Sequence, residues 1–424
     1  MFTVERERKE GGKTMNEETR RFSGPDLDAL VRTPGGEILP APLGLREAQR
    51  VRRFHRTLPG YRATPLASLD GLAARLGVAR LFVKDESPRF GLNAFKVLGG
   101  SYAIARILGQ RLGIPEEDLT FPLLQSEGVR ERAGSLTFAT ATDGNHGRGV
   151  AWAARTLGYH AVIFLPRGTA RSRVAAIEAT GAEAIVTELT YDDAVRQARK
   201  IAKDRGWVVV QDTAWDGYEE IPSWVLQGYL TMADEAADQL ALEGVEAPTH
   251  VFLQAGVGTM AASAAGYLAQ RCRPLPRFLL VEPDRADCLF VSAEAGDGRP
   301  HPTEGDLTSI MAGLSCGEPN PQVWPILQDL GTAFFRCRDH VAALGMRLLA
   351  HPLPGDPAVL SGESGAVGPG LLYLLQTREA YAPLRAALNL GPDSTVLCFS
   401  TEGDTDPENY RRVLWEGAYP LPEA

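Results

Sequence analysis

Short apolar runs and helical patterns alternate along most of this 424-residue chain, and this alternation limits the folds that it can adopt. Nine apolar runs predict strands, at residues 81–84, 136–141, 161–165, 183–187, 207–211, 250–254, 278–281, 333–337 and 395–399. Helical periodicity predicts helices at residues 66–76, 95–112, 149–157, 171–180, 192–205, 224–240, 260–270 and 341–349. Strands rich in valine, isoleucine and leucine that alternate with helices are typical of parallel sheets covered on both faces. The sequence therefore predicts an α/β fold.

The length of the chain suggests two or three lobes. No internal repeat or low-complexity linker marks a boundary, so we expect the chain to cross between the lobes more than once. We predict a larger lobe formed by residues 41–98 and 218–424, with residues 99–217 inserted as a smaller lobe. The charged, glycine-punctuated start of the chain predicts a disordered extension over residues 1–40.

Charge and composition argue against several classes of function. Lysine and arginine number 44 and aspartate and glutamate 53, which gives a net charge of −9 and no basic stripe for nucleic acid. No apolar run approaches the length of a bilayer span, and residues 1–21 lack the apolar segment of a signal peptide. The five cysteines form no CxxC pair, and no histidine stands in a metal-binding pattern. We therefore predict a cytoplasmic protein without a metal site.

Residues 84–96, with the sequence KDESPRFGLNAFK, lead from a predicted strand into a predicted helix. Lys96 is therefore expected at a helix entrance, where the positive end of the helix dipole disfavours a permanent ammonium. Keeping a lysine neutral at pH 7 opposes a difference of roughly 3 pK units, and covalent capture by an aldehyde removes this cost. Taken alone, the residue also fits an ordinary surface lysine.

A second motif, TDGNHGRG at residues 142–149, follows a predicted strand and opens a helix. Its glycines allow a ligand to approach the backbone closely, and exposed amides at a helix N-terminus suit an anionic group such as a carboxylate. Asp143 and Asn145 are expected to project at the mouth of this turn. The alternative is an ordinary capped turn.

The motif QAGVGTM at residues 254–260 has the form of a phosphate-binding turn, with two glycines, a hydroxyl and a row of amides at a helix N-terminus. It also matches GxGxxA, and the acidic Glu282 ends the next predicted strand, as in a dinucleotide-binding fingerprint. A lone GxGxxA is a weak signal, and here it follows several other strands. A phosphate site and an NAD site both stay open at this point.

Three further motifs lie at predicted strand or helix ends. QDTAW at residues 211–215 places Asp212 at a strand end, which in parallel sheets borders the ligand crevice. STEGDTD at residues 400–406 places the hydroxyls of Ser400 and Thr401 at another strand end. A hydroxyl there can hydrogen-bond a ring nitrogen without placing a charge on it. SGESGA at residues 361–366 opens a helix, and each of these motifs could equally be a cap or a turn.

In content and order, these blocks resemble those of the diaminopropionate ammonia-lyases. The resemblance covers roughly residues 55–416 and extends to MAGLSCGEPNP at residues 311–321. These are pyridoxal-phosphate enzymes of the tryptophan-synthase β-like group, fold type II, which also holds threonine dehydratases and cysteine synthases. The resemblance implies two lobes, each a mostly parallel sheet covered by helices, with the cofactor in the larger lobe, and it implies a homodimer.

Residue by residue, the resemblance implies Lys96 as the Schiff-base lysine and Asn145 as the group beside the 3-hydroxyl of the cofactor. Ser400 is similar in position to the hydroxyl that meets the pyridine nitrogen, with Thr401 as a substitute. The acidic residues that face the substrate are Asp143 and Asp212, with Thr142 beside them. The implied phosphate loop consists of Gly256, Val257, Gly258, Thr259 and Met260.

The implied reaction is β-elimination of ammonia from D- or L-2,3-diaminopropionate, which gives pyruvate and two molecules of ammonia. Lys96 would be one base for the Cα proton, Asp143 on the opposite face would be the other, and Asp212 would orient the β-amine. The nearest rival is a serine or threonine dehydratase on the same scaffold. An NAD-dependent oxidoreductase rests on GxGxxA and Glu282 alone.

The chain departs from the family pattern in its extended amino terminus and in extra residues around 123–133, which could alter an access loop. Cys288 and Cys316 lie near two of the shared blocks. A reversible disulfide between them is the alternative to two thiols in a reducing cytoplasm.

Overall fold

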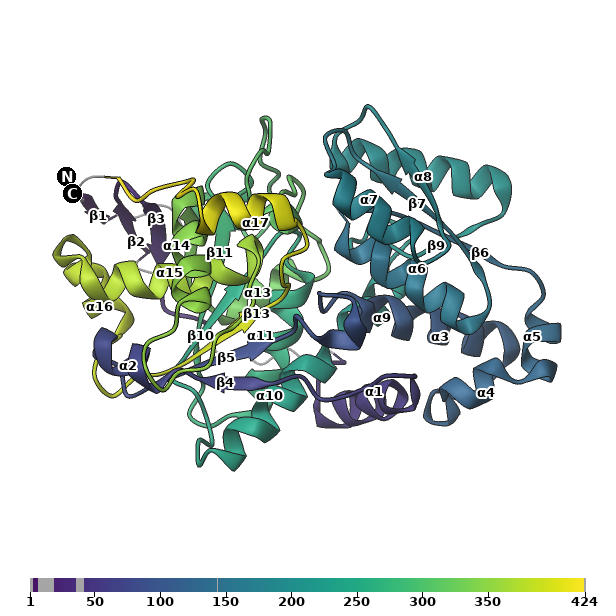
Figure 1. The fold of residues 1–424 in the computed structure, drawn as a ribbon, viewed down its shortest axis with the longest axis horizontal. Coiled ribbons are helices and arrows are strands. Elements are labelled where there is room, and N and C mark those ends of the chain that lie inside the picture. The colour runs from purple at the N-terminus through teal and green to yellow at the C-terminus, as the bar shows by residue number, and fades with distance from the viewer. Residues whose placement is uncertain (1–2, 7–18, 36–41, 143, 423–424) are drawn as a thin grey trace.

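Two sheets organise the protein, one in each of the two bodies seen in Figure 1. The computed structural model describes residues 3–6, 19–35, 42–142 and 144–422. Among these residues, the larger sheet has nine strands in the order β1-β2-β3-β12-β11-β10-β13-β5-β4, and the smaller has four in the order β8-β7-β6-β9. The strands are β1 (Thr3–Arg6), β2 (Arg20–Ser23), β3 (Leu27–Val31), β4 (Leu66–Ser68), β5 (Arg80–Asp85), β6 (Thr137–Ala141), β7 (His160–Leu165), β8 (Glu183–Val186), β9 (Val208–Val209), β10 (His250–Gln254), β11 (Arg277–Pro283), β12 (Gly331–Cys337) and β13 (Thr395–Ser400).

The α-helices occupy most of the sequence between these strands. They are α1 (Leu45–Thr57), α2 (Asp70–Leu76), α3 (Val97–Leu112), α4 (Phe121–Gln125), α5 (Glu127–Ala133), α6 (Asn145–Leu157), α7 (Arg171–Glu178), α8 (Tyr191–Arg205), α9 (Glu220–Gly228), α10 (Leu230–Leu242), α11 (Thr259–Arg271), α12 (Cys288–Ala295), α13 (Trp324–Leu330), α14 (Asp339–Ala350), α15 (Glu363–Thr377), α16 (Ala382–Leu388) and α17 (Pro407–Leu414). None of them is both long enough and apolar enough to cross a bilayer.

Parallel pairing forms the centre of both sheets. Strands β5, β13, β10, β11 and β12 run parallel in the larger sheet, and β6 pairs in parallel with β7 and β9 in the smaller one. All nine strands predicted from the apolar runs are present, with small shifts at their ends. The predicted α/β class, with two mostly parallel sheets covered by helices, is confirmed.

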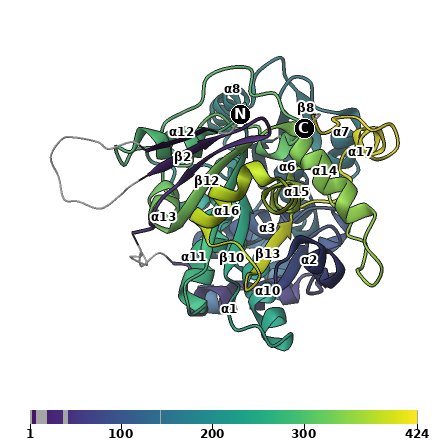
Figure 2. The same cartoon turned by 90° about the vertical axis from the view of Figure 1, so that its left-hand side faces the viewer.

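Helices cover both faces of each sheet, as strand β11 illustrates. Leu280 belongs to an apolar core with side chains of α1, α10 and α11, whereas its neighbours Leu279 and Val281 belong to a second core with α14 and α15. Because successive side chains of a strand point to opposite faces, each central strand contributes to both cores. Figure 2 shows α14 and α15 on one side of the larger sheet and α10 and α11 on the other.

The amino-terminal region differs from the expected disordered extension. Strands β2 and β3 pair antiparallel, and β3 extends the larger sheet by pairing with β12. Phe22 and Leu27 are buried in the core that contains α14, and burial of apolar side chains supplies the free energy that orders this hairpin. The prediction for residues 1–40 is therefore wrong over residues 3–6, which pair with β2 as strand β1, and over residues 20–31, while residues 1–2, 7–18 and 36–40 lie outside the described residues.

Two of the predicted helices are divided. Residues 66–76 form β4, an antiparallel edge strand beside β5, followed by α2. The helix predicted at residues 224–240 is interrupted at Tyr229, between α9 and α10. This interruption lies where α9 approaches α3 so closely that a Cβ on Gly228 would lie 2.5 Å from the carbonyl oxygen of Leu98.

Helix α3 connects the two lobes. It packs against both α9 and α6, and a Cβ on Gly149 of α6 would lie 2.7 Å from the backbone of Val97. Only glycine permits this approach, which fixes the first residue of α3 directly after Lys96. The four strands of the smaller sheet lie between residues 137 and 209, and the exact boundaries of the inserted lobe, 99 and 217, remain a prediction.

Candidate active site

One cavity lies at the carboxyl ends of the central strands, where parallel sheets form their ligand crevice. Lys96 reaches it from the segment after β5, Asp212 from the segment after β9, and Thr401 from the end of β13. The first residues of α6 and α11, Asn145 and Thr259, complete its wall. The sequence motifs from both lobes therefore meet at a single place.

Lys96 is the residue that caps the N-terminus of α3, as the sequence predicted. Its Nζ donates a hydrogen bond of 2.9 Å to Oδ2 of Asp212. The segment ahead of it is held by an isolated bridge between Ala94 and Glu402, with a bond of 3.1 Å from Phe95 N to Thr401 O. The backbone after β13 thus fixes the position from which the lysine enters the cavity.

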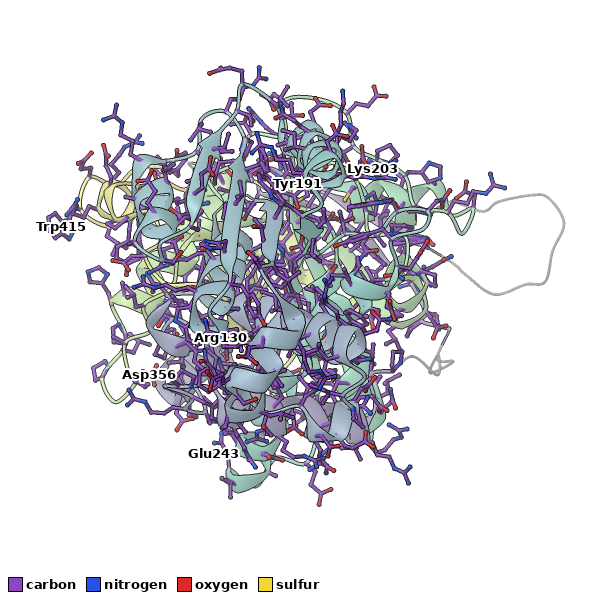
Figure 3. The ribbon with its side chains drawn as sticks, turned by 90° about the vertical axis from the view of Figure 1, so that its right-hand side faces the viewer. Arg130, Tyr191, Lys203, Glu243, Asp356 and Trp415 are labelled. Atoms are coloured by element: carbon purple, nitrogen blue, oxygen red, sulfur yellow. The ribbon has the colours of Figure 1, made fainter. Side chains whose placement is uncertain are left out.

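Asp212 is buried opposite this lysine. Burial raises the pKa of a carboxyl, but the charges of Lys96 and His146 outweigh it and hold the pKa of Asp212 well below its usual range. Oδ1 of Asp212 lies 3.3 Å from the hydroxyl of Tyr191. Tyr191 is the first residue of α8 and is labelled in Figure 3. The hydroxyl of Thr259 donates to the carbonyl oxygen of Asp212 at 2.7 Å. The carboxylate is therefore ionised and bonded through both of its oxygens, and Thr259 holds the backbone of the same residue.

The turn between β10 and α11 forms the floor of the cavity. Gly258 adopts a φ of +96°, in the left-handed region that favours glycine. The amides of the first turn of α11 have no acceptor within the helix, and the positive end of the dipole of this 13-residue helix reinforces them. Gly256, Val257, Gly258, Thr259 and Met260 all line the cavity, so this wall suits a phosphate group.

Asn145 lies at the start of α6 and faces Glu402, which accepts a hydrogen bond from its Nδ2. The hydroxyl of Thr142 bonds within its own turn, because Oγ1 accepts from the amides of Gly144 at 2.9 Å and Gly147 at 3.0 Å. It thereby shapes the turn and does not line the cavity. Asp143 lies outside the described residues.

The two hydroxyls at the end of β13 differ in position. Thr401 lines the cavity, whereas Ser400 is fully buried and is not part of its wall. Gln254 donates from Nε2 to Oγ1 of Thr401 at 2.8 Å. Because this bond occupies a lone pair of the oxygen, the hydroxyl proton of Thr401 remains to be donated to another acceptor.

Glu282, the acidic residue of the dinucleotide-binding interpretation, bonds to the start of α12. It is fully buried, and its two carboxylate oxygens accept from the amides of Leu289 at 2.8 Å and Phe290 at 2.7 Å. These bonds cap the first turn of α12. A carboxylate used in this way is not presented to a ribose, so this geometry gives no support to an NAD site.

All five cysteines are buried, and the described residues contain no disulfide. Burial, followed by the charge of Glu282, raises the pKa of Cys288 well above its ordinary value. The Cys288–Cys316 disulfide considered from the sequence is therefore not formed in this structure, and Cys316 instead lines the cavity.

The extra residues around 123–133 form α4 and α5, which pack at the far end of the smaller lobe in Figure 1. They contact α3 and α6, and none of them lines the cavity.

The sequence interpretation assigned no role to several residues of the cavity wall. Glu402, Ser364, Cys316, Gly313 and Leu314 belong to quoted motifs, so their neighbourhood was signalled even though their roles were not. Tyr229 follows from no sequence signal, because it enters through the interruption between α9 and α10. The wall residues without a sequence assignment are Phe95, Tyr229, Gln254, Ala255, Gly313, Leu314, Cys316, Ser364 and Glu402.

Comparison with known proteins agrees with this geometry. A family described as "Pyridoxal-phosphate dependent enzyme" matches residues 57–398. The chain is 52% identical over 374 residues to the diaminopropionate ammonia-lyase of Escherichia coli strain K12, which covers 88% of this chain and 92% of the relative. The chain belongs to the diaminopropionate ammonia-lyase family.

Solved structures of this family have the same fold. The holo diaminopropionate ammonia-lyase from Escherichia coli matches with a TM-score of 0.87 and 49% identity, over 94% of this chain and 98% of that one. The same enzyme in complex with D-serine matches with a TM-score of 0.87 and 48% identity, over 93% and 98% of the two chains. Members of the family are pyridoxal-phosphate-dependent lyases of fold type II.

The cavity contains the amine and the hydrogen-bond donors that pyridoxal phosphate requires. Lys96 supplies a primary amine inside it, and the first turn of α11 supplies backbone amides and a helix dipole for a phosphate. Thr401 supplies a neutral hydroxyl whose proton is not used by Gln254. An aldehyde, a phosphate and a pyridine nitrogen each find a matching group among the residues of this chain.

Proposed function

We propose that this protein eliminates ammonia from 2,3-diaminopropionate, in both the D and the L form, to give pyruvate and two molecules of ammonia. The observation that carries the proposal is the 2.9 Å pair of Lys96 and Asp212 beside the amide turn at the start of α11. Membership of the family supports the same reaction.

Pyridoxal phosphate, when bound, supplies an aldehyde that captures amines and a ring that accepts the electrons of the broken Cα–H bond. In our proposal Lys96 would hold the cofactor through its aldehyde, and the Nζ of this lysine would accept the Cα proton of the substrate. Asp143 serves as the second base, for the enantiomer whose proton lies on the other face. Asp212 stays ionised and holds the cationic β-amine of the substrate, with Thr142 shaping the turn beside it.

We assign the remaining contacts with the cofactor from the hydrogen-bond donors that the cavity offers. Asn145 donates to the 3-hydroxyl of the cofactor, and the turn of Gly256, Val257, Gly258, Thr259 and Met260 binds its phosphate. For the pyridine nitrogen we assign Thr401 as the hydrogen-bond donor, with Ser400 behind it. A neutral partner at this nitrogen favours elimination over reactions that need a fully protonated ring.

We also propose that the enzyme is a cytoplasmic homodimer. The five cysteines of the sequence form no CxxC pair, which favours a reducing compartment, and the resemblance to the family supports the dimer. Sedimentation of the purified protein tests the assembly. A monomer at micromolar concentration contradicts it.

A serine or threonine dehydratase is the second candidate, because a family member has been crystallised with D-serine. The test compares pyruvate or 2-oxobutyrate formation from D- and L-diaminopropionate, D- and L-serine, and L-threonine under one condition. We expect kcat/KM to be highest for the two diaminopropionate isomers. A higher kcat/KM for a hydroxy amino acid would assign the protein to the dehydratases instead.

A further inference from the structure

Two cavities adjoin at the start of α15, where Glu363 lines one and Ser364 lines the other. The inner one is the cavity described above, and the outer one is an open cleft of about 800 Å³ between the lobes, lined by Arg173 and Glu363 among others. Glu402 and Ser364 face the inner cavity, and Glu363 faces the cleft. The side chains of Glu402, Glu363 and Ser364 are 2%, 2% and 3% exposed. Buried carboxylates are costly unless they are bonded, so their partners indicate what they do.

Glu402 bonds to elements of both lobes. One oxygen accepts from Nδ2 of Asn145 in the smaller lobe and from Oγ1 of Thr405 at 3.0 Å. The other accepts from the amide of Ser364 at 3.3 Å, at the start of α15 in the larger lobe. Its backbone forms the bridge to Ala94, two residues before Lys96. Glu402 thus contacts the two segments that carry Asn145 and Lys96, which are both assigned to the cofactor.

The smaller lobe reaches this residue by a second route. Nη2 of Arg173 in α7 donates to Oγ1 of Thr405 at 3.4 Å, and Thr405 in turn donates to Glu402. The alkyl part of Arg173 also packs on the turn before Asn145, because a Cβ on Gly144 would lie 3.1 Å from its Cδ. The two contacts across the lobes therefore converge on Glu402.

We propose that Glu402 is a positioning residue, which orients the amide of Asn145 towards the 3-hydroxyl of the cofactor and couples this contact to the joining of the lobes. This inference rests on the proposed function. An asparagine amide has two N–H groups. When Glu402 accepts one of them, the amide cannot rotate by 180°, and the second N–H stays available to the cofactor.

A second buried carboxyl, that of Glu363, supports this assignment. Burial, followed by the charge of Glu402, raises the pKa of Glu363 to about 7, while Asn409 at 2.6 Å and the charge of Arg173 oppose the rise. Two neighbouring buried carboxylates avoid carrying two charges. Glu363 is therefore largely protonated below about pH 7.

The test is a thermodynamic cycle on cofactor binding. Apo forms of the wild type, Glu402→Ala, Asn145→Ala and the double variant are titrated with pyridoxal 5'-phosphate, and the dissociation constant is read from the visible absorbance. We expect each single variant to bind about tenfold more weakly or worse, since a hydrogen bond to a charged group contributes on that scale. The double variant should bind no more than about threefold more weakly than Asn145→Ala alone, because both changes remove one interaction.

Conservative and control variants complete the cycle. Glu402→Gln keeps an acceptor for Asn145 and should restore binding to within about threefold of the wild type, and Glu408→Ala, an exposed carboxylate of the same cleft, should have no effect. If Glu402→Ala does not fold, Thr405→Val takes its place. This variant keeps the carboxylate but removes one of its hydrogen-bond donors, and we expect an intermediate loss of cofactor affinity. The position of the visible band should shift in Glu402→Ala and in Asn145→Ala alike.

Two outcomes would overturn the inference without touching the proposed function. Unchanged cofactor binding by Glu402→Ala is one, and losses that simply multiply in the double variant are the other. Failure of the wild-type protein to bind pyridoxal phosphate at Lys96 would instead remove the proposed function itself.

Discussion

Nζ of Lys96 lies 2.9 Å from Oδ2 of Asp212, and the two residues come from different sheets. Lys96 follows β5 of the larger sheet, and Asp212 follows β9 of the smaller one. The pair is therefore a contact between the lobes, and the proposed function uses both of its side chains. Lobe packing and chemistry are linked at this point, and several predictions depend on the link.

Replacement of Asp212 by asparagine tests the pair directly. Asp212→Asn keeps the shape of the side chain but removes the charge that holds the β-amine and faces Lys96. We expect kcat/KM for diaminopropionate to fall by roughly 10²–10⁴-fold. The apo protein should also lose about 1–3 kcal/mol of unfolding free energy, because Lys96 keeps a charge without its partner.

A matched control exists in the same lobe. Asp193 pairs with Arg196 at 2.9 Å on the exposed surface of α8. Asp193→Asn should change neither activity nor stability by more than about 1 kcal/mol. If the two substitutions changed kcat/KM equally, Asp212 would have no specific role in the reaction.

The two-base proposal predicts a difference between enantiomers. Asp143→Asn should retain the visible absorbance of the bound cofactor, because Lys96 is intact. It should lose activity mainly towards D-diaminopropionate, by roughly 10²-fold or more, if Asp143 removes the proton on that face. Pyruvate formation from each isomer is the measurement, and an equal loss with both isomers would refute two separate bases.

The turn at Gly258 should be sensitive to any side chain. Its φ of +96° strains other residues, and a Cβ there would lie 2.8 Å from Cδ1 of Leu327. Gly258→Ala should therefore destabilise the protein by about 1–3 kcal/mol and weaken cofactor binding. Gly244 has a φ of +75° with open space around it, so Gly244→Ala should show the strain of about 1 kcal/mol without any loss of cofactor. Thermal unfolding and absorbance titration measure both effects.

Stability should depend on pH through Glu363. Its pKa is about 7 in the folded protein, against 4.5 for the ordinary group. The native state therefore binds the extra proton between pH 4.5 and 7, and stability contributed by this group falls as the pH rises through that window. The slope is at most about 1.4 kcal/mol per pH unit, and the total loss above pH 7 is on the order of 3–4 kcal/mol.

Glu363→Gln removes this titration and keeps an acceptor for Asn409. We expect the variant to match the wild type at pH 4.5 and to exceed its melting temperature increasingly up to pH 7, with a constant difference above that. The charged groups around Glu363 are Glu402 and Arg173, and Tyr410 lies close enough to respond to it. A difference that is independent of pH would mean that Glu363 is ionised throughout.

Much of this site could be predicted because its chemistry is local in sequence. Lys96 at a helix entrance, the amide turn before α11 and the hydroxyls after β13 each follow from strand ends and turn residues. The parallel sheets could be predicted because nine of the strands are apolar runs. The β2–β3 hairpin could not, because its strands are short and its burial of Phe22 depends on β12, more than 300 residues away in the sequence.

The features of the site that the sequence could not predict also depend on contacts between distant segments. The choice between Ser400 and Thr401 depends on the direction of a strand end and on Gln254 from the neighbouring strand. The role of Glu402 depends on Asn145 from the other lobe. Glu282 fitted a dinucleotide pattern by spacing, yet it caps α12, which only the packing reveals. Contacts between distant segments leave no periodic signal in the chain.

The central claim is a covalent bond between Lys96 and the aldehyde of pyridoxal phosphate, and borohydride reduction tests it most directly. The purified holoenzyme is reduced, digested and mapped by mass spectrometry, with Lys96→Ala as the control. We predict a yellow protein that loses its colour on reduction and then carries one reduced pyridoxyl phosphate group on Lys96, with none in the variant. A label on another lysine, or a protein that takes up no label in excess cofactor, would contradict the account.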